Sequence, residues 1–146
     1  MSLEGPYDSQ NIFAKMLRGE MACVKAFEDD VALAIMDVFP QSPGHTLVLP
    51  KIPARNFLDL PADKVGPYIE RVQRLARAVR KAFSPDGVTI MQFNGAAAGQ
   101  SVFHAHFHIV PRWEGVNIKR HGAAGMADQE ELKAQAAKIA SALQSN

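Results

Sequence analysis

The chain has 146 residues, 47% of them hydrophobic and 21% charged, which is typical of one globular domain. We therefore expect a single domain over residues 1–146, with residues 1–8 flexible or in part vector-derived. The formal net charge of +1 disfavours both a broad nucleic-acid-binding surface and a basic membrane-binding face. The chain has one cysteine, Cys23, which excludes an internal disulfide. Because we find no secretory signal and no apolar run long enough to span a membrane, we expect a cytoplasmic protein.

The hydrophobic pattern predicts, in chain order, a helix over residues 11–17, strands over 22–27, 31–38 and 45–49, a helix over 62–83, strands over 88–93 and 102–110, and a helix over 129–143. The long helix carries one apolar stripe, and Pro67 predicts an irregular first turn. Asp128 is placed to cap the last helix. Because strands come in adjacent pairs and helices are segregated, we expect an α+β fold with a mainly antiparallel five-stranded sheet, one long central helix and a C-terminal helix.

Three of the five histidines fall on the strand predicted over residues 102–110. Because strand side chains alternate between faces, His104, His106 and His108 are expected to share one face, with apolar residues on the other. Such a row fits a solvated sheet face, a metal site, or imidazole chemistry on a substrate. The row lacks a carboxylate at short ligand spacing, which weighs against the metal site.

The loop before the row, residues 94–101, is rich in glycine and alanine and ends in Gln100 and Ser101. Backbone N–H groups, an amide and a hydroxyl are donors that suit a phosphate. The loop has the spacing of neither a Walker loop nor a dinucleotide-binding fingerprint. Phosphate binding is one interpretation of this loop, and a simple turn is the other.

The row and several other motifs together resemble the histidine-triad (HIT) superfamily of nucleotide hydrolases and transferases. The family signature is His-φ-His-φ-His-φ-φ, where φ is apolar, and the chain reads His-Ala-His-Phe-His-Ile-Val over residues 104–110. The resemblance extends over most of the chain, through Ile12-Phe13, Arg18-Gly19-Glu20, Asp37, residues 43–51, Asn94-Gly95 and residues 98–102. It implies a HIT-like fold and an enzyme of the nucleotidyl hydrolase or transferase type.

The resemblance implies a catalytic group of four histidines: His45, His104, His106 and His108. The central residue of the triad, His106, would attack the α-phosphorus of a nucleotide and form a nucleotidyl-imidazole intermediate, which water then hydrolyses. The backbone carbonyl of His104 would accept the proton on the other ring nitrogen of His106. His45 and His104 would supply the supporting hydrogen bonds.

The resemblance also implies a substrate-binding set: Ile12, Phe13, Asp37, Asn94, Gly99, Gln100, Ser101 and Val102. Asp37 would accept hydrogen bonds from ribose hydroxyls, and Ile12 and Phe13 would line the pocket of the base, for which a purine is expected. The loop over residues 94–101 and His108 would hold the phosphate oxygens.

One departure from the family concerns zinc. Many bacterial relatives carry a structural zinc on a Cys-x-x-Cys pair and a downstream histidine. The matching positions here are Asn11, Ala14 and Pro53, so we expect no metal and no cofactor. Relatives commonly form two-fold dimers, and the resemblance implies a homodimer with two active sites.

Several alternatives stay open at this point. The substrate is a nucleoside phosphoramidate or a dinucleoside polyphosphate. Trp113 stacks on a second base or lies at a dimer contact, and Lys119, Arg120 and His121 contact a polyphosphate or form a solvated basic turn. The other functions considered are a metal-dependent hydrolase with the histidine row as ligands, and a nucleotide-binding regulatory protein without catalysis.

Overall fold

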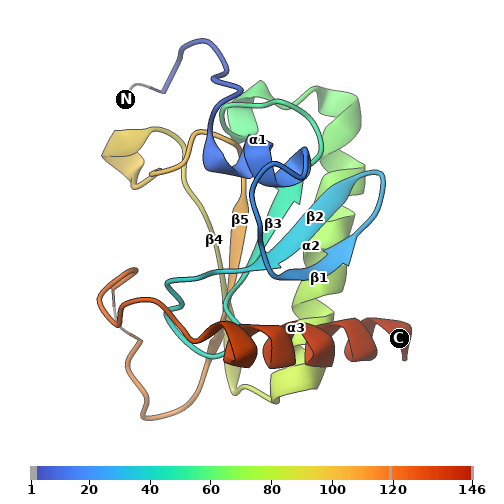
Figure 1. Cartoon of the computed structure of the whole chain (residues 1–146), viewed down its shortest axis with the longest axis vertical. Coiled ribbons are helices and arrows are strands. Elements are labelled where there is room, and N and C mark those ends of the chain that lie inside the picture. The colour runs from blue at the N-terminus through green and yellow to red at the C-terminus, as the bar shows by residue number, and fades with distance from the viewer. Residues whose placement is uncertain (1–2, 119, 146) are drawn as a thin grey trace.

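A five-stranded antiparallel sheet lies at the centre of the structure, in the strand order β1-β2-β3-β5-β4 (Figure 1). The computed structural model describes residues 3–118 and 120–145. Its elements are α1 (Ile12–Leu17), β1 (Lys25–Glu28), β2 (Ala32–Met36), β3 (Thr46–Pro50), η1 (Phe57–Asp59), α2 (Ala62–Phe83), β4 (Gly87–Gln92), η2 (Ala96–Ala98), β5 (Phe107–Arg112) and α3 (Gln129–Gln144). The predicted fold class and order of helices and strands are confirmed.

The two faces of the sheet are covered by different helices (Figure 1). Side chains of β2 alternate between these faces. Leu33 and Ile35 pack with Phe13 of α1, whereas Ala34 packs in a second cluster that includes Leu75 of α2. Burial of apolar side chains on both faces stabilises the sheet. The short helix α1 covers only part of its face, and a pocket lies beside it.

The two long helices follow the predicted pattern closely. α2 spans the predicted residues 62–83 and includes Pro67, and α3 ends one residue later than predicted. The side chain of Asp128 accepts a hydrogen bond from the Glu131 N–H at 3.3 Å, so the predicted cap is confirmed. Among the described residues, no helix is long and apolar enough to cross a membrane.

The prediction of a strand over residues 102–110 is wrong in its first half. β5 begins at Phe107, so His104 and His106 precede it. β3 pairs with β5 through its first three residues only, and its last residue, Pro50, has no N–H to extend a ladder. The Pro50 carbonyl instead accepts a hydrogen bond from His104 Nε2 at 2.9 Å. Strand alternation therefore does not place all three histidines on one face.

The segment expected to be flexible, residues 1–8, makes hydrogen bonds with the domain through its described part. Asn56 Nδ2 donates to the Leu3 carbonyl, Arg55 donates to the Pro6 carbonyl, and the Tyr7 hydroxyl lies 2.6 Å from His104 Nδ1.

Candidate functional site

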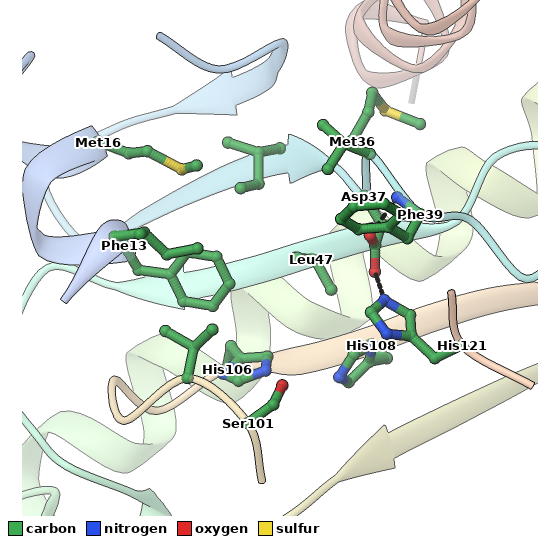
Figure 2. Close-up of a pocket in the computed structure, with 14 residues that line it drawn as sticks. Phe13, Met16, Met36, Asp37, Phe39, Leu47, Ser101, His106, His108 and His121 are labelled. Atoms are coloured by element: carbon green, nitrogen blue, oxygen red, sulfur yellow. Dashed lines mark hydrogen bonds and ion pairs between the residues drawn. The ribbon is translucent and has the colours of Figure 1, made fainter. Parts of the chain in front are cut away.

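A pocket of about 210 Å³ lies between α1, the end of β2 and the segment that leads into β5 (Figure 2). Seven residues singled out from the sequence line it: Ile12, Phe13, Asp37, Ser101, Val102, His106 and His108. Figure 2 shows Phe13 and Met16 on one side of the pocket, with His106 next to Phe13. Asp37, His108 and His121 lie toward the other side, which we call the polar end. The other predicted site residues, His45, Asn94, Gly99, Gln100 and His104, lie outside this lining.

His106 is held in one tautomer by the backbone. Its Nδ1 lies 2.7 Å from the carbonyl oxygen of His104. Because a carbonyl only accepts, Nδ1 carries the proton, and Nε2 keeps its lone pair. Burial lowers the pKa of His106, so the ring is neutral near pH 7. The edge of the ring packs against Phe13, with the ring centroids 4.9 Å apart.

His45 and His108 form a second oriented pair. The Gln41 N–H donates to His45 Nδ1 at 3.0 Å, so the proton of the neutral His45 ring is on Nε2. His45 Nε2 lies 3.0 Å from His108 Nδ1 and therefore donates to it. Burial lowers the pKa of His45 to about 4 and that of His108 to about 3, which keeps both rings neutral. His108 consequently carries its proton on Nε2, and a hydrogen-bond donor stands beside the lone pair of His106.

Asp37 sits at the polar end of the pocket and already has donors on both oxygens. Its Oδ1 accepts a hydrogen bond from the Phe39 N–H at 2.8 Å. Its Oδ2 lies 2.8 Å from His121 Nε2, which donates to it, and 3.4 Å from His45 Nε2 (Figure 2). Asp37 is therefore a buried hydrogen-bond acceptor, and His121 is one of its donors.

His121 belongs to neither of the two site sets predicted from the sequence, which leaves it open between a polyphosphate contact and a solvated basic turn. It comes from the segment between β5 and α3, and its ring also packs against the edges of Phe39, His45 and His108. Arg120 is exposed, and Lys119 lies outside the described residues. A histidine in a glycine-rich loop gives no periodic signal, so only the tertiary structure brings it to the pocket.

His104 lies behind the pocket and uses both ring nitrogens for structure. Nε2 donates to the Pro50 carbonyl, and Nδ1 accepts from the Tyr7 hydroxyl at 2.6 Å. Burial lowers the pKa of His104 to about 4, so this ring is neutral as well. Tyr7 is the second residue that sequence reasoning missed, because the contact joins positions 97 residues apart.

The loop before His104 is shaped by its own side chains. Gln100 is 4% exposed; its Oε1 accepts from the Gly95 N–H at 2.7 Å, and its Nε2 donates to two backbone carbonyls. The Asn94 side chain likewise accepts from a backbone N–H, and Gly99 adopts a φ of +103°, which favours glycine. A direct phosphate contact by Gln100 or Asn94 stays a prediction.

Comparison with known families decides the identity of the fold. A family model for the HIT domain matches residues 18–115. The chain belongs to the HIT family.

Relatives of this HIT domain include named enzymes. HINT3 of Arabidopsis thaliana, an adenylylsulfatase, is 38% identical over 116 residues, which cover 75% of this chain but only 59% of HINT3. The adenosine 5′-monophosphoramidase hnt1 of Schizosaccharomyces pombe is 38% identical over 101 residues, or 69% of this chain and 73% of hnt1. A solved structure of a Hit-like protein involved in cell-cycle regulation, from Bartonella henselae, has a TM-score of 0.90 at 48% identity and covers 94% of this chain and 99% of its own. Family membership and the two enzyme names class the chain with enzymes of the nucleotidyl hydrolase type.

The three positions that match a structural zinc site in HIT relatives are Asn11, Ala14 and Pro53. The Asn11 side chain accepts the Ala14 N–H at 2.9 Å and so caps α1. Neither Ala14 nor Pro53 offers a ligand atom on its side chain. These residues do not fit a structural zinc.

A second set of possible metal ligands lies at the polar end of the pocket, with one of its members, His45, outside the lining. One ligand atom each from Asp37, His45 and His108 lie within 4.8 Å of one another, and this carboxylate was not apparent from the sequence. A metal on His45 Nε2 would force the ring proton onto Nδ1, where the Gln41 N–H already donates. Histidine ligands normally donate their other N–H to an acceptor, so His45 is oriented wrongly for this role. The hydrogen-bond pattern fits an oriented imidazole pair and does not fit a metal site.

Proposed function

We propose that this HIT domain cleaves nucleotides at the α-phosphate through a covalent nucleotidyl intermediate on His106. The observation that carries the proposal is the hydrogen bond from His106 Nδ1 to the His104 carbonyl, since it leaves Nε2 as an unprotonated nucleophile at the pocket. The low pKa that burial imposes keeps this nitrogen unprotonated at neutral pH.

The reaction has two displacements. In the first, a bond forms between His106 Nε2 and the α-phosphorus, the bond from phosphorus to the leaving group breaks, and an amine leaving group takes up a proton from solvent. In the second, water attacks the same phosphorus and releases a proton to solvent, the phosphorus–nitrogen bond breaks, and the nucleoside monophosphate leaves with neutral His106, still protonated on Nδ1, restored. Imidazole suits both displacements, because it is a good nucleophile in the first and a good leaving group in the second.

Two donors beside His106 suit the negative charge on the phosphate oxygens. His108 presents its Nε2–H because its Nδ1 is occupied by His45, and Ser101 lines the same part of the pocket. Donors that are fixed before the substrate binds stabilise a developing charge without reorganisation. His45 thus acts on the phosphate through His108.

The remaining walls suit a nucleoside. Ile12, Phe13 and Val102 give a flat apolar end for a base, for which we propose a purine, and Asp37 gives an acceptor for ribose hydroxyls. The two enzyme relatives support adenylyl substrates with different leaving groups, sulfate in one and an amine in the other. Phosphoramidates are therefore the first substrates to test, followed by adenylylsulfate and dinucleoside polyphosphates.

The intermediate itself can be trapped. We expect that mixing the enzyme with an adenosine phosphoramidate and quenching in alkaline denaturant gives a peptide containing His106 with one added adenylyl group, seen by mass spectrometry. Alkaline conditions are chosen because phosphohistidine bonds are labile in acid. A non-catalytic nucleotide-binding protein predicts no adduct and no turnover, and this outcome would contradict the proposal.

We also propose a homodimer whose interface is formed by β4 and the groove between β4 and α2. β4 is an edge strand, and the groove between it and α2 is lined mainly by apolar side chains, among them Ile69, Val88, Ile90 and Phe107. Ile90 is 48% exposed although it lies on a strand. An edge strand with exposed apolar side chains is suited to pair with a second copy across a two-fold axis.

The dimer is tested by charge. Ile90→Glu is expected to convert a dimer to a monomer in size-exclusion chromatography with light scattering. The reason is that desolvating a carboxylate in this mainly apolar contact costs more than an ion pair with Arg77 or Arg80 of the groove returns. The matched control is Leu58→Glu, an exposed leucine on η1 that does not line the groove, which is expected to leave the mass unchanged. A monomeric wild-type protein, or a dimeric Ile90→Glu variant, would show that this interface is wrong.

A further inference from the structure

His121 is hydrogen-bonded to the carboxylate of Asp37, which the proposed function assigns to ribose. Its Nε2 donates to Asp37 Oδ2 at 2.8 Å, while Oδ1 is used by the Phe39 N–H. Asp37 is 5% exposed, whereas the His121 side chain that lies over it is 45% exposed. Both residues line the pocket, and Figure 2 shows the hydrogen bond between them at one side of it, so a ligand that binds Asp37 Oδ2 competes with His121 Nε2.

The size of the pocket agrees with a partly filled site. Its volume of about 210 Å³ lies below the roughly 300–1,000 Å³ of pockets that hold small-molecule ligands. The His121 ring forms part of the wall at the polar end, in edge contact with Phe39 and His108. Withdrawal of this ring would enlarge the pocket where a ribose has to fit.

The segment that carries His121 joins β5 to α3 without a helix or strand in its described part. Backbone hydrogen bonds from the Ala123 N–H to the Arg120 carbonyl and from the Gly125 N–H to the Gly122 carbonyl close turns beside His121. The His121 side chain itself is half-exposed, and an exposed side chain changes rotamer more readily than one in the core.

We infer that His121 is a specificity-determining residue: it holds Asp37 in the empty site and gives up that carboxylate only to a ligand with a vicinal diol. The inference rests on the proposed function, because it takes Asp37 as the acceptor for ribose. The physical reason is that a buried carboxylate oxygen that loses its donor is costly, since Oδ1 keeps the Phe39 N–H but Oδ2 would keep only His45 Nε2 at 3.4 Å. A ribose replaces the lost imidazole donor with hydroxyl donors, and a dideoxyribose cannot.

The experiment compares the affinities of two nucleotides by isothermal titration calorimetry. The probes are adenosine monophosphate and its 2′,3′-dideoxy analogue, measured on the wild-type enzyme, on His121→Ala and on Arg120→Ala. Removal of the internal competitor is expected to tighten adenosine monophosphate binding about threefold to tenfold in His121→Ala, the range that one hydrogen bond accounts for. The dideoxy analogue gains only the space that the His121 ring leaves and no hydrogen bond to Asp37, so its affinity is expected to change less and the ratio between the two ligands to grow.

Arg120→Ala is the matched control, since this exposed neighbour belongs to the same segment. It is expected to bind both nucleotides as the wild-type enzyme does. A direct readout is the carbon-bound proton signal of the His121 ring in NMR spectra, which should move when adenosine monophosphate is added and stay in place with the dideoxy analogue.

Each other result has a definite meaning. If adenosine monophosphate binds His121→Ala more weakly, His121 contacts the nucleotide directly and the inference is wrong; unchanged affinity overturns it as well, because no competition exists. Failure of the ribose assignment is distinguished by Asp37→Ala, which removes both acceptor oxygens. Should this variant bind adenosine monophosphate as tightly as the wild type, Asp37 is not the ribose acceptor and the inference falls with that assignment, whereas the adduct on His106 tests the reaction independently.

Discussion

Replacing His106 with alanine is expected to lower kcat/KM by about 10⁴-fold or more on every substrate that the enzyme turns over. Nε2 of this residue is the only group of the protein that forms a bond to phosphorus in the proposed mechanism. Its loss removes both displacements, and the remaining donors can only bind the substrate. The measurement is the rate of release of adenosine monophosphate from an adenosine phosphoramidate, from adenylylsulfate, from diadenosine polyphosphate and from an acyl-adenylate.

Binding separates loss of chemistry from loss of structure. The affinity for adenosine monophosphate is expected to stay within about threefold in His106→Ala, because the apolar wall and the donors beside His106 remain. His106→Asn serves as the matched variant, since its amide can still donate to the His104 carbonyl while it offers no nucleophile. If either variant kept most of the wild-type rate, another residue would carry the reaction.

A chelator tests the metal-dependent alternative. A hydrolase that activates water on a metal held by Asp37, His45 and His108 would lose activity with a chelator and recover it with zinc or iron. The proposed mechanism predicts a rate that a chelator leaves unchanged. Orientation of His45 by the Gln41 N–H already favours the second result.

The fold was predictable where local pattern and tertiary packing agree. The stripe of α2 is long enough to define its face without any partner, and Asp128 at the start of α3 is a local signal that packing does not override. β5 shows the opposite case. The first half of the strand predicted over residues 102–110 has the strand pattern because apolar residues alternate with histidines. In the structure the His104 side chain bonds to the Pro50 carbonyl at the end of β3, and the His106 side chain bonds to the His104 carbonyl, so side chains replace the backbone ladder there.

The candidate site divides in the same way. The triad and the loop before it are contiguous in sequence, so motif spacing identifies them. Tyr7 and His121 reach the site from opposite ends of the chain, and no spacing relates them to the triad. The carboxylate of Asp37 was assigned to ribose, but its present partner could not be foreseen, since a loop residue chosen by tertiary contact leaves no periodic trace.

Burial of several neutral imidazoles has a cost that depends on pH. The pKa values of His45 and His104 are lowered by burial to about 4, and that of His108 to about 3, whereas an unfolded histidine has a pKa of about 6.5. At a pH between about 4 and about 6.5 the unfolded chain binds more protons than the folded one. The free energy of unfolding must then rise with pH through this window and fall as the solution is acidified.

Acidification from about pH 7 to about pH 5 is therefore expected to lower the free energy of unfolding by several kcal/mol, with about 2 kcal/mol for each histidine that stays neutral when folded. Urea denaturation at intermediate pH values measures the slope, and the curve should flatten above about pH 7, where these rings are neutral in both states. The matched variant is His104→Gln, whose amide can donate to the Pro50 carbonyl and does not titrate. It should show a slope smaller by about 1.4 kcal/mol per pH unit inside the window, whatever its overall stability. Equal slopes in the two proteins would mean that His104 is protonated in the folded state, and the neutral hydrogen-bond chain from Tyr7 through His104 would be wrong.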